Sequence, residues 1–422
     1  MKKYVIILAL ALFQLSSLAQ DLISKYKTGT IKLVQDTEFA QGNDWNTVFR
    51  SYYDTLYNRP MGMRKSLVVL PDGSVIVNHA YRNYRTKFSP SGAYEKEFEL
   101  EKAGHKAVMG VINGNTLFTG LNNMGKMTCT DFDGKYKKTL TLDYMTKDII
   151  ALNNGSFAVV GWVLWAEKIR SFVAIVDYDT NEEKVIWEDF IDRNISSSGK
   201  HLNKRQPFNY QATLKGGGIV SYTTMPYSKS TGKGLPPQIA TVNNELLVAI
   251  PNTGELFVYD LNGNLKSKTK VNWGNNTISV EEQKAIQQKA IQRYQAYLES
   301  GEEMVQKNRD AFKQIIVEMQ DDLQKINTPI EKPSFSNIIK DSDGNILFFE
   351  IPAEKDANVF HVWVYNQGGK FVAKCQFVCD EYELNISASK MVFHNGYIYS
   401  LQRLKEAKGN PLRLVRFKVE GA

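Results

Sequence analysis

One local pattern, repeated along the chain, constrains the fold most. Seven stretches each place two short runs of β-branched or aromatic residues around Asp-Gly, Asn-Gly, Gly-Gly or Asn-Asn. These turn residues tolerate the positive φ angles of tight turns, so each stretch predicts a β-hairpin. The stretches are VVLPDGSVIV (68–77), GVINGNTLFTG (110–120), IIALNNGSFAVVG (149–161), ATLKGGGIVSY (212–222), ATVNNELLVAI (240–250), IIKDSDGNILFF (338–349) and MVFHNGYIYSL (391–401).

A second strand–turn–strand element follows most of these hairpins. Its copies are TKFSPSGAYEKEFEL, TCTDFDGKYKKTLTL, AIVDYDTNEEKVIW, FVYDLNGNLKSKTKV and WVYNQGGKFVAKCQF. Two consecutive hairpins make a four-stranded unit of roughly 40 residues, which is the period of β-propeller blades. A ring of such units covers the apolar faces and edges that one small sheet leaves exposed. The sequence therefore predicts an all-β propeller.

The number of blades follows from how the units are divided. The blades expected without ambiguity are 64–100, 106–142, 147–190, 335–379 and 388–419. Residues 208–272 hold two hairpins but one clear second element, so they form either one enlarged blade or two. We favour one, which makes six blades rather than seven. The last unit has only three strands, and TGTIKLVQ (28–35) is available as the fourth, which would close the ring with both chain ends in one blade.

Residues 279–326 break the strand pattern. They are rich in Glu, Gln, Lys and Ala, which favour helices, and Ser279 with Glu282 fits a capping box. Two apolar stripes separated near Gly301 predict two helices. This helical insertion is expected to pack as a buttress on the side of the propeller. The alternatives are a cap over one face or an arm on which a partner docks.

The first residues of the sequence predict an export signal. A basic Met1-Lys2-Lys3, an apolar run from Tyr4 to Phe13 and the small residues of Ser17-Leu18-Ala19 are typical of a signal peptide, here 1–19. The mature protein, 20–422, is then expected to be a single propeller domain that is periplasmic or extracellular and has no transmembrane anchor. The formal net charge of +7 is small for 422 residues and predicts no nucleic-acid partner.

Cofactor signals are weak. The three cysteines, Cys129, Cys375 and Cys379, are an odd set and are expected to be buried free thiols. DSDGN (341–345) offers alternating oxygens, yet Ile346 stands where a calcium loop of the EF-hand type needs Gly, so a simple turn is favoured. No cofactor is predicted, although calcium or another divalent ion is compatible with these residues.

The order of parts resembles a known family. The hairpin turns, the segment LFVYDLNGNLKSKTKVNWGNNTISVEEQKA that runs from a blade into a charged helix, and the return through IEKPSFSNIIKDSDGNILFFEI are similar to six-bladed NHL/TolB-like propellers. Such propellers are exported proteins of Bacteroidota and related bacteria. The resemblance covers most of residues 28–422, and it implies a fold and an envelope location rather than an activity.

Propellers commonly bind ligands in a central funnel, on the face opposite the first-hairpin turns. The residues expected near that funnel are Arg64, His79, His105, Asn122, Trp162, Trp165, Tyr227, Glu350 and Arg403. Aromatic, cationic and amide groups around a concave mouth suit a protein, peptide or glycan ligand bound without catalysis. The alternative is a metal-dependent lactonase or lyase that would use His79, His105 and Glu350.

Overall fold

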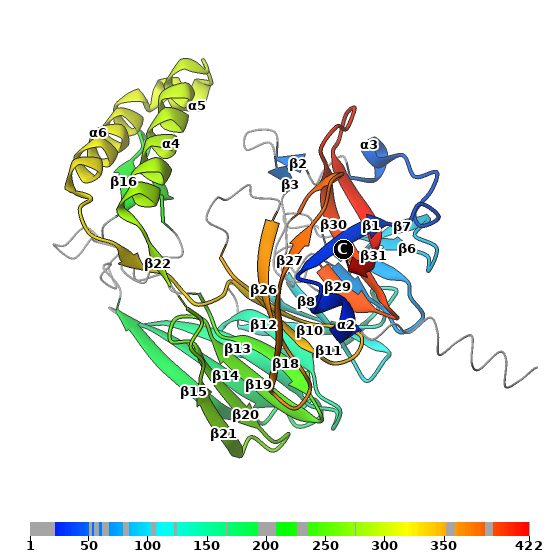
Figure 1. Ribbon diagram of the computed structural model, residues 1–422. Helices are drawn as coiled ribbons and strands as arrows, with labels where there is room; N and C mark the ends of the chain where they lie inside the picture. Colours follow the sequence, from blue (N-terminus) through cyan, green and yellow to red (C-terminus); the bar gives the residue numbers. More distant parts are fainter. Residues whose placement is uncertain are drawn as a thin grey trace, which may run out of the picture.

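The computed structural model of this chain describes residues 22–49, 53–54, 59–60, 67–78, 84–102, 107–121, 125–165, 168–192, 208–225, 235–274, 276–351, 359–384 and 391–421. The predicted signal peptide, 1–19, lies outside the described residues. Strands in mostly antiparallel sheets form the larger part of the secondary structure in the described chain (Figure 1).

Four sheets each contain four strands that are consecutive in the sequence. The first two are β4 (Leu67–Val69), β5 (Val75–Asn78), β6 (Tyr84–Phe88) and β7 (Tyr94–Glu99), then β8 (Ala107–Ile112), β9 (Thr116–Leu121), β10 (Lys126–Thr130) and β11 (Tyr136–Thr141). The next two are β12 (Met145–Ala151), β13 (Phe157–Trp165), β14 (Lys168–Val176) and β15 (Glu183–Asp192), then β18 (Gln238–Val242), β19 (Glu245–Ile250), β20 (Glu255–Tyr259) and β21 (Leu265–Lys270).

A nine-stranded sheet joins the two ends of the chain. Its strands are β24 (Asn337–Lys340), β25 (Ile346–Phe349), β26 (Val359–Tyr365), β27 (Phe371–Val378), β28 (Tyr382–Glu383), β29 (Met391–His394), β30 (Tyr397–Leu404), β31 (Leu412–Gly421) and β1 (Thr30–Gln35). Strand β1 pairs antiparallel with β31, with Leu33 opposite Val419, and parallel with β27. The prediction that residues 28–35 complete the last unit is confirmed.

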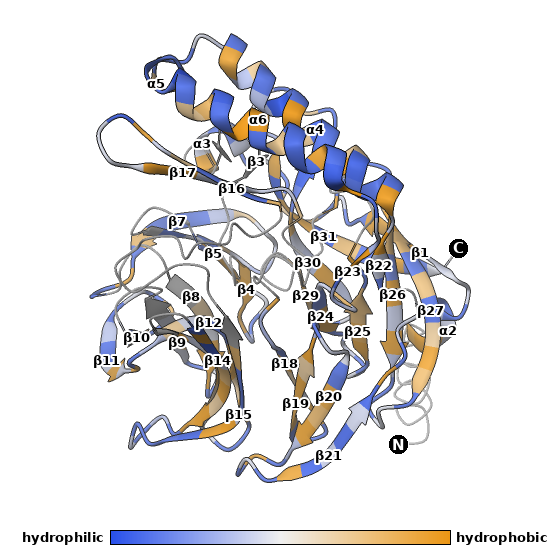
Figure 2. Cartoon of the chain, turned by 90° about the vertical axis from the view of Figure 1, so that its left-hand side faces the viewer, coloured by the Kyte–Doolittle hydropathy of each residue, from blue (hydrophilic) through white to orange (hydrophobic). Residues whose placement is uncertain are grey.

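The innermost strands close a ring. Strands β4, β8, β12, β18, β24 and β29 contact one another in that order, and β29 contacts β4. Neighbouring sheets share cores, as Val160 of β13 and Val248 of β19 do, and both are fully buried. Burial falls toward the rim: β19 is mostly buried and hydrophobic, whereas every residue of β21 is exposed (Figure 2). The all-β propeller prediction is confirmed.

The hairpin turns form for the reason that the sequence suggests. Asn243 and Asn244, with φ of 48° and 59°, join β18 to β19, and Asn395 and Gly396, with φ of 48° and 78°, join β29 to β30. Asparagine and glycine are the residues that adopt this left-handed backbone most readily. All seven predicted hairpins are present.

One hairpin does not belong to the ring. Strands β16 (Asn209–Thr213) and β17 (Ile219–Thr223) form their own two-stranded sheet, while β18–β21 form a complete four-stranded sheet by themselves. Assigning 208–272 wholly to blades was therefore wrong. The physical reason is that Tyr210 and Ala212 of β16 are buried in one core with Phe312 and Ile315 of the helical insertion.

The insertion contains three helices, α4 (Val280–Glu299), α5 (Glu303–Lys307) and α6 (Arg309–Lys325). Ser279 caps α4 by accepting a hydrogen bond from the Glu282 N–H, as predicted, and the chain turns at Gly301 with φ of 73°. Short strands β22 (Thr277–Ile278) and β23 (Ile330–Glu331) pair at its base.

The packing of these helices differs from the expected buttress. Helices α4 and α6 pack on each other and on the β16–β17 hairpin, and the group projects from the ring (Figure 1). We call β16, β17 and α4–α6 the helical module. Inside it, Tyr210 Oη donates to Asp322 Oδ2 at 2.8 Å and Gln287 Nε2 donates to Tyr210 Oη. These bonds satisfy polar groups that the module buries.

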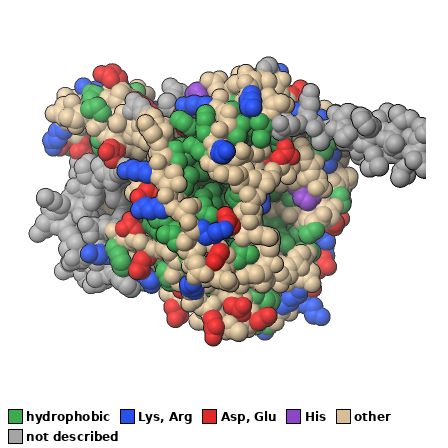
Figure 3. Space-filling view, turned by 60° about the horizontal axis from the view of Figure 1, so that its bottom comes forward, with side chains coloured by type: hydrophobic (Ala, Val, Ile, Leu, Met, Phe, Trp, Pro, Cys, Tyr) green, Lys and Arg blue, Asp and Glu red, His purple; other side chains and the backbone are tan. Residues whose placement is uncertain are grey.

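The remaining described elements are short: α2 (Leu22–Tyr26), α3 (Trp45–Val48), β2 (Tyr53–Asp54) and β3 (Arg59–Pro60). Among the described helices, none combines the length and the hydrophobicity needed to cross a bilayer. On the face in Figure 3, hydrophobic side chains gather near the middle, and charges of both signs are mixed around them.

Candidate functional site

Most of the predicted funnel residues cannot be compared with the structure. Arg64, His79, His105, Asn122 and Tyr227 lie outside the described residues. Trp165 is the last residue of β13, and only its backbone is described. Trp162, Glu350 and Arg403 are described with their side chains, and all three are half-buried.

Trp162 contacts other residues of its own sheet. Its indole Nε1 donates to Ser171 Oγ on β14 at 3.1 Å, and the Lys147 ammonium lies 4.2 Å from the ring centroid. Arg403 behaves similarly, because its guanidinium forms a salt bridge with Glu383 of β28 at 2.9 Å. Both side chains are therefore already engaged by neighbouring strands.

Glu350 is also engaged within its sheet. Its carboxylate accepts a hydrogen bond from Trp363 Nε1 and forms a salt bridge with Lys374, both at 2.6 Å. Burial raises the pKa of this carboxyl, but the bonds from Lys374 and Trp363 outweigh burial, so the pKa lies below its ordinary value. Within the described residues, no hydrogen bond or ion pair joins Trp162, Glu350 and Arg403, and no three His, Cys, Asp or Glu side chains gather as a metal site.

The three cysteines are free and buried, as predicted. Burial raises the pKa of Cys129 to about 11 and that of Cys375 to about 12. A thiol that stays protonated is a poor nucleophile and a poor metal ligand. These thiols therefore serve the hydrophobic core.

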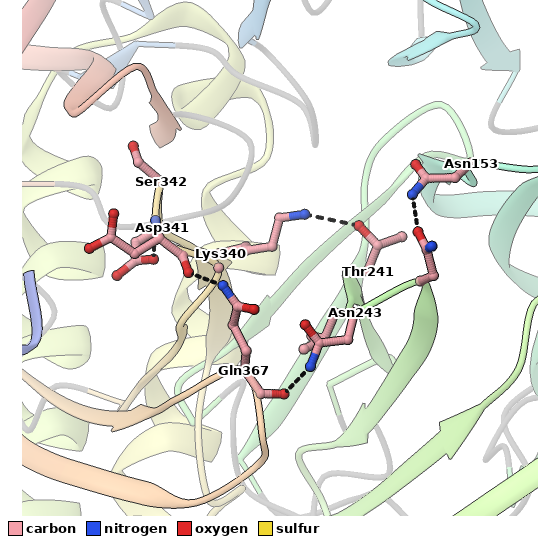
Figure 4. Close-up of a pocket in the computed structure, with 11 residues that line it drawn as sticks. Asn153, Thr241, Asn243, Lys340, Asp341, Ser342 and Gln367 are labelled. Atoms are coloured by element: carbon pink, nitrogen blue, oxygen red, sulfur yellow. Dashed lines mark hydrogen bonds between the residues drawn. The ribbon is translucent and has the colours of Figure 1, made fainter. Parts of the chain in front are cut away.

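A cavity lies on the face that carries the first-hairpin turns. Its volume is about 480 Å³, within the range of small-molecule sites (Figure 4). We call it the turn-face pocket. It is lined by the turns β12–β13, β18–β19, β24–β25 and β26–β27, through Asn153, Thr241, Val242, Asn243, Asn244, Lys340, Asp341, Ser342, Asp343, Gly344 and Gln367.

Hydrogen bonds between turns hold the amide side chains of this pocket in place. Asn243 Nδ2 donates to the Gln367 carbonyl at 2.8 Å, and the Gln367 side-chain amide donates to the Asp343 carbonyl. The Asn153 amide donates to Asn244 Oδ1 across two sheets. The lining is therefore positioned before any ligand arrives.

Lys340 supplies the positive charge of the pocket. Its ammonium donates to Thr241 Oγ1 at 3.1 Å, across the gap between β24 and β18 (Figure 4). The side chain can be reached from solvent, yet loss of hydration lowers the pKa of Lys340 below its ordinary value. A partly dehydrated ammonium gains more from an anion than a fully hydrated one does.

The acidic residues of the lining accept hydrogen bonds from other parts of the fold. Asp341 is only 3% exposed, and its carboxylate accepts hydrogen bonds from Tyr26 Oη and from the backbone and side chain of Asn345. Burial raises the pKa of Asp341 above its ordinary value. Asp343 Oδ2 accepts from the Leu22 N–H at 3.2 Å. The turn expected at 341–345 is thus present, and its acids fasten α2 to the ring.

The sequence predicts a binding site in the central funnel, on the face opposite the turn-face pocket. The sequence predicts tight turns at Asn153, Asn243 and 341–345, the last of which was also compared with a calcium loop. A usable signal was present, since amide and hydroxyl side chains recur at turns that a propeller brings to one face. Lys340 carries no such signal. Gln367 is an amide at a turn, but only the pairing of blades places it beside Asn243 and places Lys340 beside Thr241.

The fold and the pocket together define a β-propeller with a polar, hydrogen-bonding cavity between its blades. No protein-family model matches the chain, and no curated protein matches its sequence. Among solved structures, it is similar to a member of the DUF4221 family from Bacteroides vulgatus, with 12% identity, a TM-score of 0.45 and coverage of 94% of this chain and 100% of that one.

Two further solved structures are similar to this chain. A putative gluconolactonase has 10% identity and a TM-score of 0.40, with 92% of this chain and 97% of that one covered. Virginiamycin B lyase from Staphylococcus aureus has 11% identity and a TM-score of 0.36, with 85% and 95% covered. The propeller assignment rests on the strand pairing and ring closure of this chain itself.

Proposed function

We propose that this protein is an exported, six-bladed propeller of the NHL/TolB-like type that binds a ligand at the cell envelope without catalysis. The turn-face pocket is its binding site. The export signal in the sequence supports the location in the periplasm or outside the cell. The cyclic order of the innermost strands supports six blades.

One observation carries the binding role: amide groups from separate blades are already fixed around a cavity. Asn243 and Gln367 are joined at 2.8 Å although they are 124 residues apart in the sequence. Fixed polar groups lose little conformational entropy when a ligand binds, which favours affinity and specificity. Such a lining suits a polar ligand, either a glycan or a peptide segment, and this role requires no cofactor.

A binding screen tests the proposal. The mature chain, beginning at Gln20, is applied to glycan and peptide arrays beside the variants Asn243→Ala and Asn262→Ala. Asn262 is an exposed turn residue of the same sheet, between β20 and β21, and serves as the matched control. We expect specific ligands that the wild type and Asn262→Ala bind and Asn243→Ala does not.

Two outcomes would contradict this role. Binding that Asn243→Ala retains in full would place the site elsewhere on the molecule. Hydrolysis or elimination of a lactone substrate that a chelator abolishes and a divalent ion restores would establish the metal-dependent lactonase or lyase role instead.

A further inference from the structure

The turn-face pocket presents one cation without a carboxylate partner. A lysine ammonium has three hydrogen-bond donors, and Thr241 Oγ1 accepts one donor of Lys340 at 3.1 Å. Among the described residues, no salt bridge joins Lys340 to an acid. The two acids of the same turn, Asp341 and Asp343, accept hydrogen bonds from Tyr26 and from the Leu22 N–H instead. The cavity therefore offers an ammonium to an incoming anion.

The amide groups of the pocket offer both donors and acceptors. In Asn153, Asn243 and Gln367 one N–H of the NH₂ group donates to a protein oxygen of a neighbouring turn. Each of these side chains keeps a second N–H, which donates, and a carbonyl oxygen, which accepts hydrogen bonds. Hydroxyl groups, which both donate and accept, are the ligand groups that match such amides on separate turns.

These two properties select a ligand class. We propose that the turn-face pocket takes a sugar acid, with its carboxylate at Lys340 and its hydroxyls at the amide groups of Asn153, Asn243 and Gln367. This inference rests on the proposed binding function and narrows it. A neutral sugar would leave the ammonium without an anion, and a peptide carboxyl terminus brings few hydroxyls to the amide groups.

Calorimetry on the full mature chain tests the class of ligand. The probes are glucuronate, galacturonate, their neutral counterparts glucose and galactose, and trialanine as a peptide carboxylate. At least one of the two acids is expected to bind at least tenfold more tightly than its neutral counterpart and than trialanine. Its affinity is expected to fall with added salt, because an ion pair is screened.

Single substitutions test separately how the pocket recognises the charge and the hydroxyls of the ligand. Lys340→Met should weaken binding of the acid about tenfold or more while leaving the weak binding of the neutral sugar unchanged. Asn243→Ala should weaken both. Lys313→Met, which removes an exposed lysine of α6, is the matched control and should change neither. Melting temperatures close to that of the wild type show that each variant is folded.

The outcomes distinguish this inference from the function on which it rests. If Lys340→Met binds the acid as the wild type does, or if trialanine binds and no sugar acid does, the sugar-acid inference is overturned. If array ligands other than sugar acids bind and are lost in Asn243→Ala, the pocket remains a binding site with another ligand class. If the wild type binds no probe and no array ligand, both proposals fail.

Discussion

The phenol of Tyr26 donates to Asp341 Oδ2 at 2.9 Å and so joins the first described helix to a turn 315 residues later. Both residues are buried. Removing the hydroxyl leaves a buried carboxylate with one donor fewer. Tyr26→Phe should therefore lower the free energy of unfolding by about 1–3 kcal/mol, measured by urea denaturation.

Tyr94→Phe is the control for that change. Tyr94 is 43% exposed, so its loss of a hydroxyl should change stability by no more than about 0.5 kcal/mol. Equal effects of the two substitutions would show that the Tyr26–Asp341 bond does not stabilise the fold.

The ion pair between Asp36 and Arg416 should make stability depend on pH. Burial raises the pKa of Asp36, but hydrogen bonds from Arg416, at 2.6 Å, and from the Glu38 N–H outweigh it, so the folded pKa lies below the ordinary value of an aspartate. A carboxyl with a lowered folded pKa stabilises the protein above its unfolded pKa. That stabilisation is lost as the pH falls through the folded pKa.

Asp36→Asn should therefore destabilise the protein at pH 7 by about 2–3 kcal/mol, because it leaves a partly buried guanidinium without its anion. The difference between wild type and variant should shrink as the pH falls below about 4. Unfolding free energies measured from pH 7 to pH 2 check this. Wild-type and Asp36→Asn curves that stay parallel over the whole pH range would refute the linkage. Asp310→Asn, which changes an exposed acid of α6, is the control and should leave the pH dependence of stability unchanged.

Two turn glycines differ in the space around them. Gly134 and Gly114 both have positive φ, of 91° and 67°, but an added Cβ at Gly134 would lie 2.3 Å from the Glu99 carbonyl oxygen, whereas at Gly114 it would meet nothing within 4 Å. Gly134→Ala should destabilise the protein by about 1–3 kcal/mol more than Gly114→Ala does. Both substitutions place an alanine at positive φ, so similar melting temperatures of the two variants would disprove the steric argument.

Adjacent residues of α6 test whether the helical module has its own core. Ile316 is 7% exposed and Val317 is 62% exposed. Ile316→Ala should destabilise the module by about 2–5 kcal/mol, while Val317→Ala should change little. Hydrogen exchange should show faster exchange in β16, β17 and α4–α6 and little change in the ring. Equal acceleration in the ring strands would show that module and ring unfold together.

Local chemistry made most of the fold predictable. A turn such as Asn243-Asn244 requires positive φ whatever surrounds it, so the hairpins could be located from the sequence alone. The same local pattern occurs in 212–222, and there it gave the wrong assignment. Nothing within that hairpin says that Tyr210 packs on Phe312 rather than on a neighbouring blade, because this choice is made by residues that follow some 100 positions later.

The candidate site was harder to predict because it belongs to no single segment. Lys340 and Thr241 meet only because β24 lies next to β18 in the ring. The sequence singled out Glu350 and Arg403 by their positions at strand ends, and the structure pairs them with Lys374 and Glu383 of their own sheet. The position of a residue in its strand predicts where its side chain lies along a blade, but not which neighbouring residue it pairs with.

The double pairing of β1 sets the order in which this molecule can be completed. Residues 30–35 are synthesised long before their antiparallel partners in β31. Until β31 has been made, this strand has nothing to pair with along that edge, and the ring stays open. A polypeptide of this design can assemble individual blades as it emerges, but its ring cannot close before β31 is available. Any truncation that removes β31 should leave an open, aggregation-prone arc.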